Sequence, residues 1–419
     1  MKYNLNDKPS ILPFLLYGLQ WWLVSIPSVI IIGAIVSQIH YTEPAEQIFY
    51  LQKLFAVIGI AVLAQVLWGH KLPLIIGPAS VLLIGILASV SSGTAAIYTA
   101  VLIGGALIAI LSATGLLSNI QFIFTPRIVT VILILIAFTL SPVIIRLVTE
   151  GDKNSYTDLL FAILLTLSLI ICNRVLKGVW KSTTVLWGII VGSVLYYAMY
   201  GLPDLSTGVS SLKAPTINFH LDLDPGTILA FVFCFITLII NELGSIQAVG
   251  QMLLADKMKQ RTSRGIGVLG ASNMVAGLMG VIGPVDYSMS PGVISATGCA
   301  SRYTLIPAGI GLAICGFFPD MINFLIHIPG VVMGSVLLYL MSTQLAAGLQ
   351  MLTREQAVTD FNSGIIIAVP LMVSILITFA PAETLNQIPS LLRPILGNGF
   401  VMGLIAVLLM ELVIMRKKK

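Results

Sequence analysis

The stretches LIIGPAS at residues 74–80 and YSMSPG at residues 287–292 interrupt a chain that is otherwise almost continuously apolar. Both contain glycine and proline, the two residues that fit least well inside a helix. In hydrocarbon an unpartnered backbone N–H or C=O is costly, so non-helical backbone persists only where protein buries it or a polar cavity hydrates it. Two breaks at comparable places in the two halves predict a substrate site between inverted repeats, as in membrane transporters.

The composition places the chain in a membrane. Of the 419 residues, 57% are hydrophobic and 9% are charged, whereas about 25% are charged in ordinary soluble domains. The basic residues lie between apolar runs and at the C-terminus, so they do not indicate a nucleic-acid partner. The first apolar run is too long for a cleavable signal peptide. We therefore expect an integral protein of the cell (inner) membrane, surrounded by lipid bilayer.

Apolar runs of membrane length, or near it, number seven in each half. In the first half they cover residues 12–36, 49–68, 74–90, 95–116, 128–148, 159–172 and 185–200. In the second half they cover residues 228–255, 268–281, 289–296, 303–318, 331–349, 365–379 and 400–414. A complete crossing needs about 20 residues, so we expect the third run of each half to be a half-helix preceded by extended chain. The predicted fold is an all-α polytopic membrane protein with fourteen segments in a seven-plus-seven inverted repeat.

The distribution of lysine and arginine supports this count. With both termini in the cytoplasm, all but five of the 22 basic residues fall on the inner side, as the positive-inside rule requires. An odd number of segments inverts the second copy relative to the first. We therefore expect residues 1–200 to form the first repeat, residues 226–419 the second, and residues 201–225 a linker on the outer side.

Carboxylates within the apolar runs are few. Glu242 lies about 24 Å from Gly226 along a helix, at 1.5 Å per residue, which places it near the middle of the membrane. A charged group at that depth normally faces a cavity, a partner or an ion pathway. Glu242 is thus a candidate for substrate binding or for a coupled proton, and the alternative is a neutral structural residue. Asp286 precedes the second break, where it either carries a coupled proton or caps the following half-helix.

Smaller polar residues mark the expected starts of the half-helices. Ser80 and Ser290 can donate to a ligand beside a helix N-terminus, or they can satisfy the interrupted backbone. No spacing of cysteine, histidine or carboxylate residues indicates a metal site, and the four histidines are assigned no chemistry. Nor is there a nucleophile–base pair, so we expect neither a cofactor nor enzymatic activity.

Several motifs resemble those of a known family. The strongest is GVISATGCASRY at residues 292–303, with further similarities in GLQ at 18–20, KLP at 71–73, IPG at 328–330 and Tyr339. Together they resemble the nucleobase/ascorbate transporters, also called nucleobase–cation symporters, which include uracil and xanthine permeases. This resemblance implies the fourteen-segment fold, its division into a core and a gate domain each drawn from both repeats, and a homodimer formed through the gate.

The chain departs from the family pattern at the expected ligand contacts, so it is similar to a divergent member. It has Met289-Ser290 where the family has Glu or Gln followed by Asn, and a thioether cannot make the paired hydrogen bonds of those groups. The family's ligand-binding Glu lies three residues before a Gly, and counting back from Gly244 leads to Asn241. Either a one-residue shift brings Glu242 into the site, or Asn241 binds the ligand and Glu242 faces elsewhere, since adjacent helix positions differ by about 100°.

The resemblance and the residues together predict a secondary active transporter for a nucleobase-like heterocycle, a purine or pyrimidine base, coupled to protons and working by alternating access of core against gate. The candidate substrate contacts are Glu242, Asn241, Ser80, Met289, Ser290, Ser245 and Tyr339. The candidate proton-coupling residues are Glu242 and Asp286. The alternative is an anion transporter on the same scaffold, resembling the sulfate permeases, although a central Glu242 would repel an anion.

Overall fold

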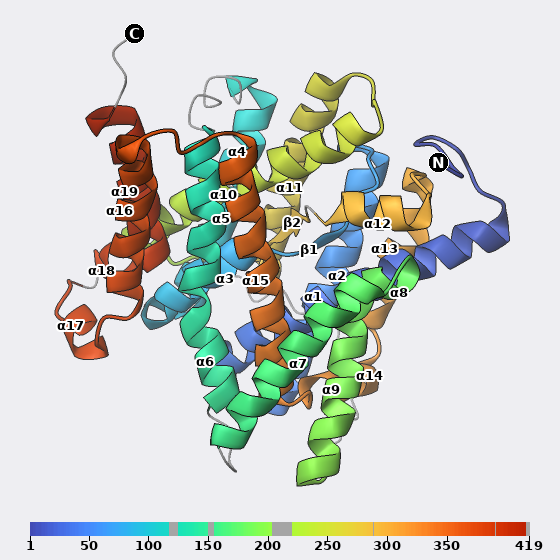
Figure 1. Cartoon of the computed structure of the whole chain (residues 1–419), viewed down its shortest axis with the longest axis horizontal. Coiled ribbons are helices and arrows are strands. Elements are labelled where there is room, and N and C mark those ends of the chain that lie inside the picture. Colours follow the sequence, from blue (N-terminus) through green and yellow to red (C-terminus); the bar gives the residue numbers. More distant parts are fainter. Residues whose placement is uncertain (117–124, 150–154, 203–219, 288, 390, 416–419) are drawn as a thin grey trace.

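The computed structural model describes residues 1–419 except 117–124, 150–154, 203–219, 288, 390 and 416–419, and it is mostly helical (Figure 1). The first half contains α1 (Ile11–His40), α2 (Pro44–Leu67), β1 (Ile76–Pro78), α3 (Ser80–Ala88), η1 (Val90–Ser92), α4 (Gly93–Ala113), α5 (Pro126–Thr139), α6 (Ser141–Thr149), α7 (Ser155–Val175), α8 (Val179–Ser182) and α9 (Thr184–Tyr200). The second half contains α10 (Pro225–Met252), α11 (Met258–Met279), β2 (Pro284–Asp286), α12 (Ser290–Thr297), η3 (Arg302–Thr304), α13 (Leu305–Cys315), α14 (Pro319–Ile326), α15 (Gly330–Arg354), α16 (Phe361–Thr378), α17 (Ala382–Asn386), α18 (Arg393–Leu396), α19 (Gly399–Leu409) and the π-helical turn η4 (Met410–Ile414).

Eight helical segments of the described chain are long and apolar enough to cross a membrane. They are Ile11–His40, Pro44–Leu67, Val90–Ala113, Pro126–Thr149, Tyr156–Val175, Pro225–Met252, Gly330–Arg354 and Phe361–Thr378. The other expected runs also fall on helices, but these are shorter, bent or more polar. Helices α3 and α12 have nine and eight residues, α13 and α14 are bent by 85° at their junction, and α11 carries three basic residues.

A pair of short antiparallel strands lies near the middle of the molecule: β1 lies within the first sequence break, and β2 immediately precedes the second (Figure 1). In β1 and β2, Gly77 lies opposite Val285, and the pairing continues where Ala79 N donates to Gly283 O at 2.9 Å. Backbone groups left free by each helix break therefore satisfy those of the other, as a membrane interior requires. The strands lead into α3 at Ser80 and α12 at Ser290, so each half-helix follows extended backbone as the sequence predicted.

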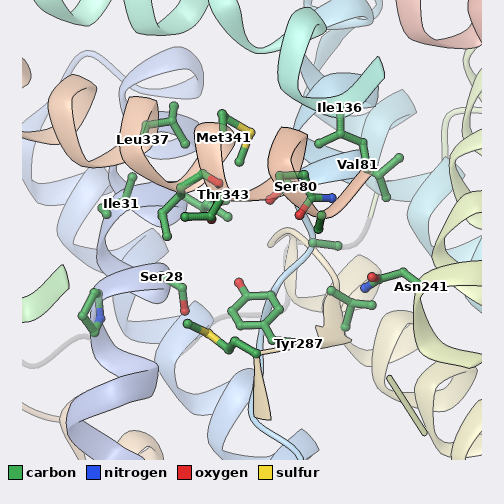
Figure 2. Close-up of a pocket in the computed structure, with 18 of the residues that line it drawn as sticks. Ser28, Ile31, Ser80, Val81, Ile136, Asn241, Tyr287, Leu337, Met341 and Thr343 are labelled. Atoms are coloured by element: carbon green, nitrogen blue, oxygen red, sulfur yellow. Dashed lines mark hydrogen bonds between the residues drawn. The ribbon is translucent and has the colours of Figure 1, made fainter. Parts of the chain in front are cut away.

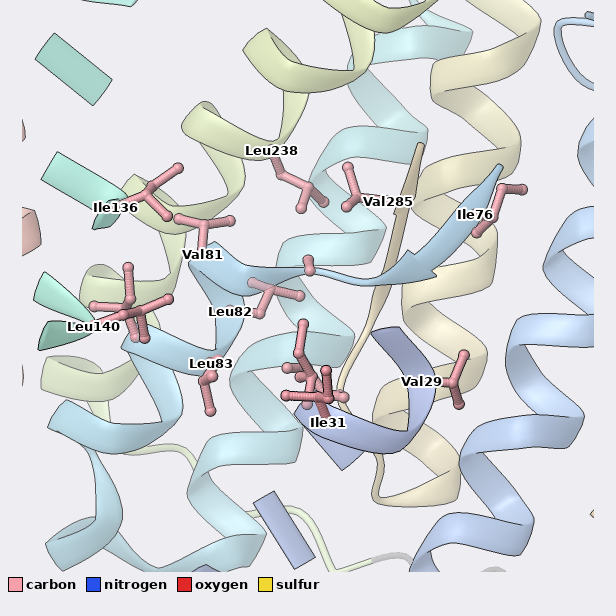
Figure 3. Close-up of a cluster of buried hydrophobic side chains, with 14 of the residues drawn as sticks. Val29, Ile31, Ile76, Val81, Leu82, Leu83, Ile136, Leu140, Leu238 and Val285 are labelled. Atoms are coloured by element: carbon pink, nitrogen blue, oxygen red, sulfur yellow. The ribbon is translucent and has the colours of Figure 1, made fainter. Parts of the chain in front are cut away.

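A buried apolar cluster surrounds the strand pair (Figure 3). Its side chains come from α1, β1, α3, α5, α10 and β2, and they include Val29, Ile31, Ile76, Val81, Leu82, Leu83, Ile136, Leu140, Leu238 and Val285. These helices belong to both halves of the chain. The strands are thus embedded in the apolar core. Their backbone groups pair with each other, and the polar groups at the strand ends bond to other parts of the protein.

The helices that pack most closely fall into two groups. In the first group α4 packs against α11 and α10, α2 against α13, and α1 against α13 and α2. In the second group α15 packs against α5, α6 and α7, and α16 packs against α5 and α19. Each group contains helices from both halves of the chain.

Glycines allow the backbones of the first group to touch. A Cβ on Gly270 of α11 would lie 2.6 Å from Ala109 N of α4, and a Cβ on Gly59 of α2 would lie 2.5 Å from Ala313 N of α13. Such distances occur only where no side chain intervenes, and small residues permit this close approach between helices in membranes.

Replacing Gly270 with alanine is expected to destabilise the protein. The added Cβ would meet backbone atoms, which cannot rotate away, and overpacking of this kind typically costs about 1–3 kcal/mol. We expect Gly270→Ala to lower the unfolding temperature of the detergent-solubilised protein. The matched control is Gly364→Ala in α16, where the nearest atom to the new Cβ lies 3.9 Å away. Equal unfolding temperatures for the two variants would contradict the close contact of α4 with α11.

Candidate functional site

A cavity of about 320 Å³ lies between the two groups of helices, at the starts of both half-helices. One wall comes from α1, α3, α10 and the β2–α12 connection, and the other from α5, α9 and α15 (Figure 2). The polar lining residues are Ser28, Ser80, Thr237, Asn241, Tyr287, Thr343 and Gln344. Among the described residues, no charged side chain lines this cavity, and the rest of its wall is apolar. A small, mostly apolar cavity with a few polar groups is typical of a site for a small molecule.

Tyr287 connects the two strands at the cavity surface. Its backbone N–H donates to Ile75 O at 2.7 Å, and its hydroxyl donates to Pro78 O at 2.8 Å. The ring lies against Gly77, where a Cβ would be 2.5 Å from the Tyr287 hydroxyl oxygen. Figure 2 shows the ring between Ser28 and Asn241. Tyr287 therefore offers an aromatic surface to the cavity, a feature that the sequence analysis did not single out.

Asn241 and Glu242 face different surroundings. Asn241 lines the cavity, and its Nδ2 donates to Asp286 O at 3.1 Å. Glu242 is fully buried away from the cavity wall, where its Oε1 accepts from Gln65 Nε2 at 3.2 Å and its Oε2 accepts from Asp286 N at 3.1 Å. Of the two arrangements left open by the sequence, the structure has the one in which Asn241 occupies the cavity position. Direct contact of Glu242 with a ligand in this cavity does not fit that geometry.

Two more of the expected contacts, Ser80 and Met289, lie at the cavity wall. Ser80 begins α3 and Met289 immediately precedes α12. Met289 is 42% exposed, so its thioether faces open space rather than packed protein. Their contact with a ligand stays a prediction, but both positions permit it.

Three other candidates do not line the cavity. Ser290 is buried, with its hydroxyl donating to Tyr287 O at 2.8 Å and accepting from Ile75 N at 2.9 Å, so it satisfies the interrupted backbone. Ser245 is buried behind Asn241, and its hydroxyl donates to Asp286 O at 3.2 Å. Tyr339 is buried within α15, outside the cavity lining.

Asp286 does not cap α12. The residue before that helix is Met289, and no side chain accepts a hydrogen bond at the helix start. Instead the Asp286 carboxyl is buried, with its Oδ2 at 3.0 Å from His70 Nε2. The capping alternative is therefore wrong, because β2 directs Asp286 away from the N-terminus of α12. The contact with His70 could not be predicted from local sequence, because more than 200 residues separate the two partners.

The fold and the cavity together define a class of protein: this is a polytopic membrane protein with a cavity for a small molecule between two groups of helices. Among solved structures, the transmembrane domain of the cyanobacterial bicarbonate transporter BicA superposes with a TM-score of 0.61 at 13% identity, covering 87% of this chain and 95% of that chain. Murine Slc26a9, an anion transporter in the inward-facing state, gives a TM-score of 0.61 at 14% identity, covering 100% of this chain and 70% of that one. At these identities the likeness concerns the fold alone.

Residues 13–383 match the permease family model of the xanthine and uracil permeases, and the chain belongs to that family. It is 26% identical to the nucleobase transporter PlUacP of Paenibacillus larvae, over 88% of this chain and 87% of that protein. It is 22% identical to the xanthine permease of Bacillus subtilis, over 94% and 92%. A Clostridium perfringens relative is 29% identical over 70% of this chain, a match that spans 65% of that relative's length. The resemblance inferred from the motifs is confirmed, and the family is one of permeases rather than enzymes.

Proposed function

We propose that this protein is a secondary active transporter of a purine or pyrimidine base. The observation that carries the proposal is the small uncharged cavity between two helix groups, at the starts of two half-helices, in a chain of the permease family. Relatives along most of the chain are named as nucleobase and xanthine transporters. Alternating access would follow from movement of one helix group against the other, since the cavity wall is divided between them.

The cavity groups match the edges of such a base. Bases present N–H donors beside carbonyl acceptors. Asn241 lines the cavity, and while its Nδ2 donates to Asp286 O, its Oδ1 can accept from a ligand N–H. The Ser80 hydroxyl and the first N–H groups of α3, which have no partner within the helix, can donate to a carbonyl. The Tyr287 ring supplies a stacking surface of the kind that aromatic ligands favour.

We further propose fourteen segments in two inverted seven-segment repeats, residues 1–200 and 226–419. Packing supports the symmetry: if α2 and α4 correspond to α11 and α13, the α4–α11 contact has its counterpart in α2–α13, and α1–α13 has its counterpart in α10–α4. The first helix group would be the core domain and the second the gate domain. Most of the expected outer linker, residues 203–219, lies outside the described residues. We also propose that both termini lie in the cytoplasm and that the protein forms a homodimer through the gate domain.

Proton coupling is proposed for Glu242 and Asp286. The two buried acids are neighbours, because the backbone N–H of Asp286 donates to Glu242 Oε2, and buried acids within a membrane protein commonly carry protons. Proton coupling predicts that uptake by the unmodified protein changes between pH 5 and pH 8, and we expect Glu242→Gln, which cannot ionise, to abolish this change. The control is Glu383→Gln on the exposed α17. A variant that keeps the original pH dependence would remove Glu242 from the coupling mechanism.

The anion-transporter alternative retains one supporting observation. Glu242 faces away from the cavity, so its charge does not repel an anion there, and the similar solved structures include transporters of bicarbonate and other anions. The sequence relatives favour a base instead.

Thermal-shift measurements on the purified protein separate the two functions, because a ligand that binds only the folded state raises the unfolding temperature. We expect a shift with one or more bases. A shift with sulfate, bicarbonate or a dicarboxylate, and with no heterocycle, would overturn the proposal.

A further inference from the structure

A cluster of four buried side chains lies behind the cavity: Gln65, His70, Glu242 and Asp286, here called the acid–imidazole cluster. Each is 0–2% exposed. The cluster joins the end of α2 and the following loop to α10 and β2. Gln65 Nε2 also donates to Gly265 O of α11 at 2.9 Å, and its Oε1 accepts from His70 N at 3.3 Å. These contacts fix the cluster between α2, α10 and α11 of the first helix group and the strand β2.

The hydrogen bonds of the His70 ring define where its proton lies. His70 Nδ1 accepts from Leu72 N at 2.9 Å, so Nδ1 carries no hydrogen. The hydrogen of the neutral ring is then on Nε2, which is 3.0 Å from Asp286 Oδ2. If Nδ1 also carried a hydrogen, its N–H would point at the N–H of Leu72, and the two donors would repel each other. The imidazole is thus a neutral ring whose Nε2–H lies beside the Asp286 carboxyl, where neither Nε2 nor the two carboxyl oxygens have a hydrogen-bond partner within the described chain.

The loop around His70 is held by one cation. Arg261 of α11 donates from Nη1 to His70 O and Lys71 O, both at 3.1 Å, and from Nη2 to Asp256 Oδ1 at 2.8 Å. The hydrogen bond and charge of Arg261 lower the pKa of the Asp256 carboxyl, which lies between α10 and α11. Arg261 is therefore directed at backbone carbonyls and at Asp256 rather than at the cluster carboxyls.

Within the described chain, the ionisable groups of the cluster are Glu242, Asp286 and the neutral His70, and no lysine or arginine side chain pairs with the two acids. Two adjacent buried carboxylates without a cation would repel each other strongly. The pair therefore holds at least one proton in its resting state.

We propose that His70 is a positioning residue for proton coupling: its unpartnered Nε2–H, 3.0 Å from Asp286 Oδ2, donates to that carboxyl when Asp286 is ionised and so stabilises the ionised form, and Glu242 gains and loses the proton. This inference rests on the proposed proton-coupled transport.

Asp286 also gives the cluster a direct connection to the cavity. Its N–H donates to Glu242, while its carbonyl accepts from Asn241 Nδ2 at 3.1 Å and from Ser245 Oγ at 3.2 Å. A change in the protonation of the Glu242–Asp286 pair can therefore alter the position of Asn241 at the cavity wall, although Glu242 does not contact the substrate.

The test is the pH profile of base uptake into proteoliposomes. Proton coupling predicts that uptake by the unmodified protein falls at alkaline pH, where the pair loses its proton. Loss of the donor in His70→Leu destabilises ionised Asp286, so the pair keeps its proton to higher pH, and this fall should move upward by about one pH unit. His70→Gln retains an N–H donor and should stay near the original profile. His220→Leu, at an exposed position, controls for loss of an imidazole.

Two results would overturn the inference: an unmoved profile in His70→Leu, or an equal displacement in His70→Gln, which would indicate a role in packing only. If Glu242→Gln leaves the pH dependence intact, the proposed coupling itself fails and this inference fails with it. If Glu242→Gln abolishes the dependence while His70→Leu does not move it, only the role of His70 is wrong.

A second measurement does not depend on the folding of His70→Leu. In protein labelled with ¹⁵N-histidine, solid-state NMR should show the His70 signal, identified by its absence from His70→Gln, with Nε2 protonated and Nδ1 unprotonated from pH 5 to pH 8. A doubly protonated ring at pH 5 would overturn the inference.

Discussion

Asn241→Leu is expected to weaken the binding of a purine or pyrimidine base by about tenfold to a hundredfold, because an unsatisfied buried donor costs about 1–3 kcal/mol. Asn241 is a cavity-lining residue whose Oδ1 is available to a ligand N–H. The leucine side chain has a similar volume but no acceptor. The protein should still fold, because Asp286 O keeps its hydrogen bond from the Ser245 hydroxyl.

This result is measured by equilibrium binding of a radiolabelled base to the purified variant. The matched control is Asn362→Leu, at an exposed position in the first turn of α16. Unchanged affinity in Asn241→Leu would mean that the ligand does not reach α10, and the placement of the binding site in this cavity would then be wrong.

Met289→Gln is expected to improve the binding of xanthine or uracil by about tenfold, which corresponds to one additional good hydrogen bond. Met289 is 42% exposed at the cavity wall, and its thioether offers polarizable apolar contact in place of paired polar groups. The unmodified protein should therefore disfavour these two bases and prefer a heterocycle with an apolar edge on that side. Glutamine restores both a donor and an acceptor at this position.

The gain is measured by competition between unlabelled xanthine or uracil and a bound base, with Met199→Gln at the end of α9 as the control. If no oxopurine or oxopyrimidine binds more tightly to a folded Met289→Gln protein, Met289 does not face the ligand.

Features encoded locally were predictable from the sequence. The interruptions before α3 and α12 follow from glycine and proline at residues 74–80 and 287–292, because these residues fit poorly inside a helix. The membrane location and the family follow from hydropathy and motifs. The choice between Asn241 and Glu242 did not follow, since their side chains point about 100° apart and the sequence does not fix the rotation of α10.

Contacts between distant segments could not be predicted. The His70–Asp286 pair exists because β1 pairs with β2 and brings the end of α2 next to β2. No local pattern encodes that meeting, and a lone histidine near the end of an apolar run is usually a packing residue. Tyr287 was part of a recognised break, but its role in connecting the strands depends on Gly77 and Pro78 in the other half.

The central claim is that the cavity between the two helix groups carries a nucleobase across the membrane. It is tested most directly by uptake into proteoliposomes containing the purified protein, with radiolabelled purine and pyrimidine bases, sulfate and bicarbonate measured side by side under an imposed inward proton gradient. The account predicts saturable uptake of at least one base, reduced in Asn241→Leu, and no uptake of either anion. Saturable uptake of sulfate or bicarbonate, with none of any base, would contradict it.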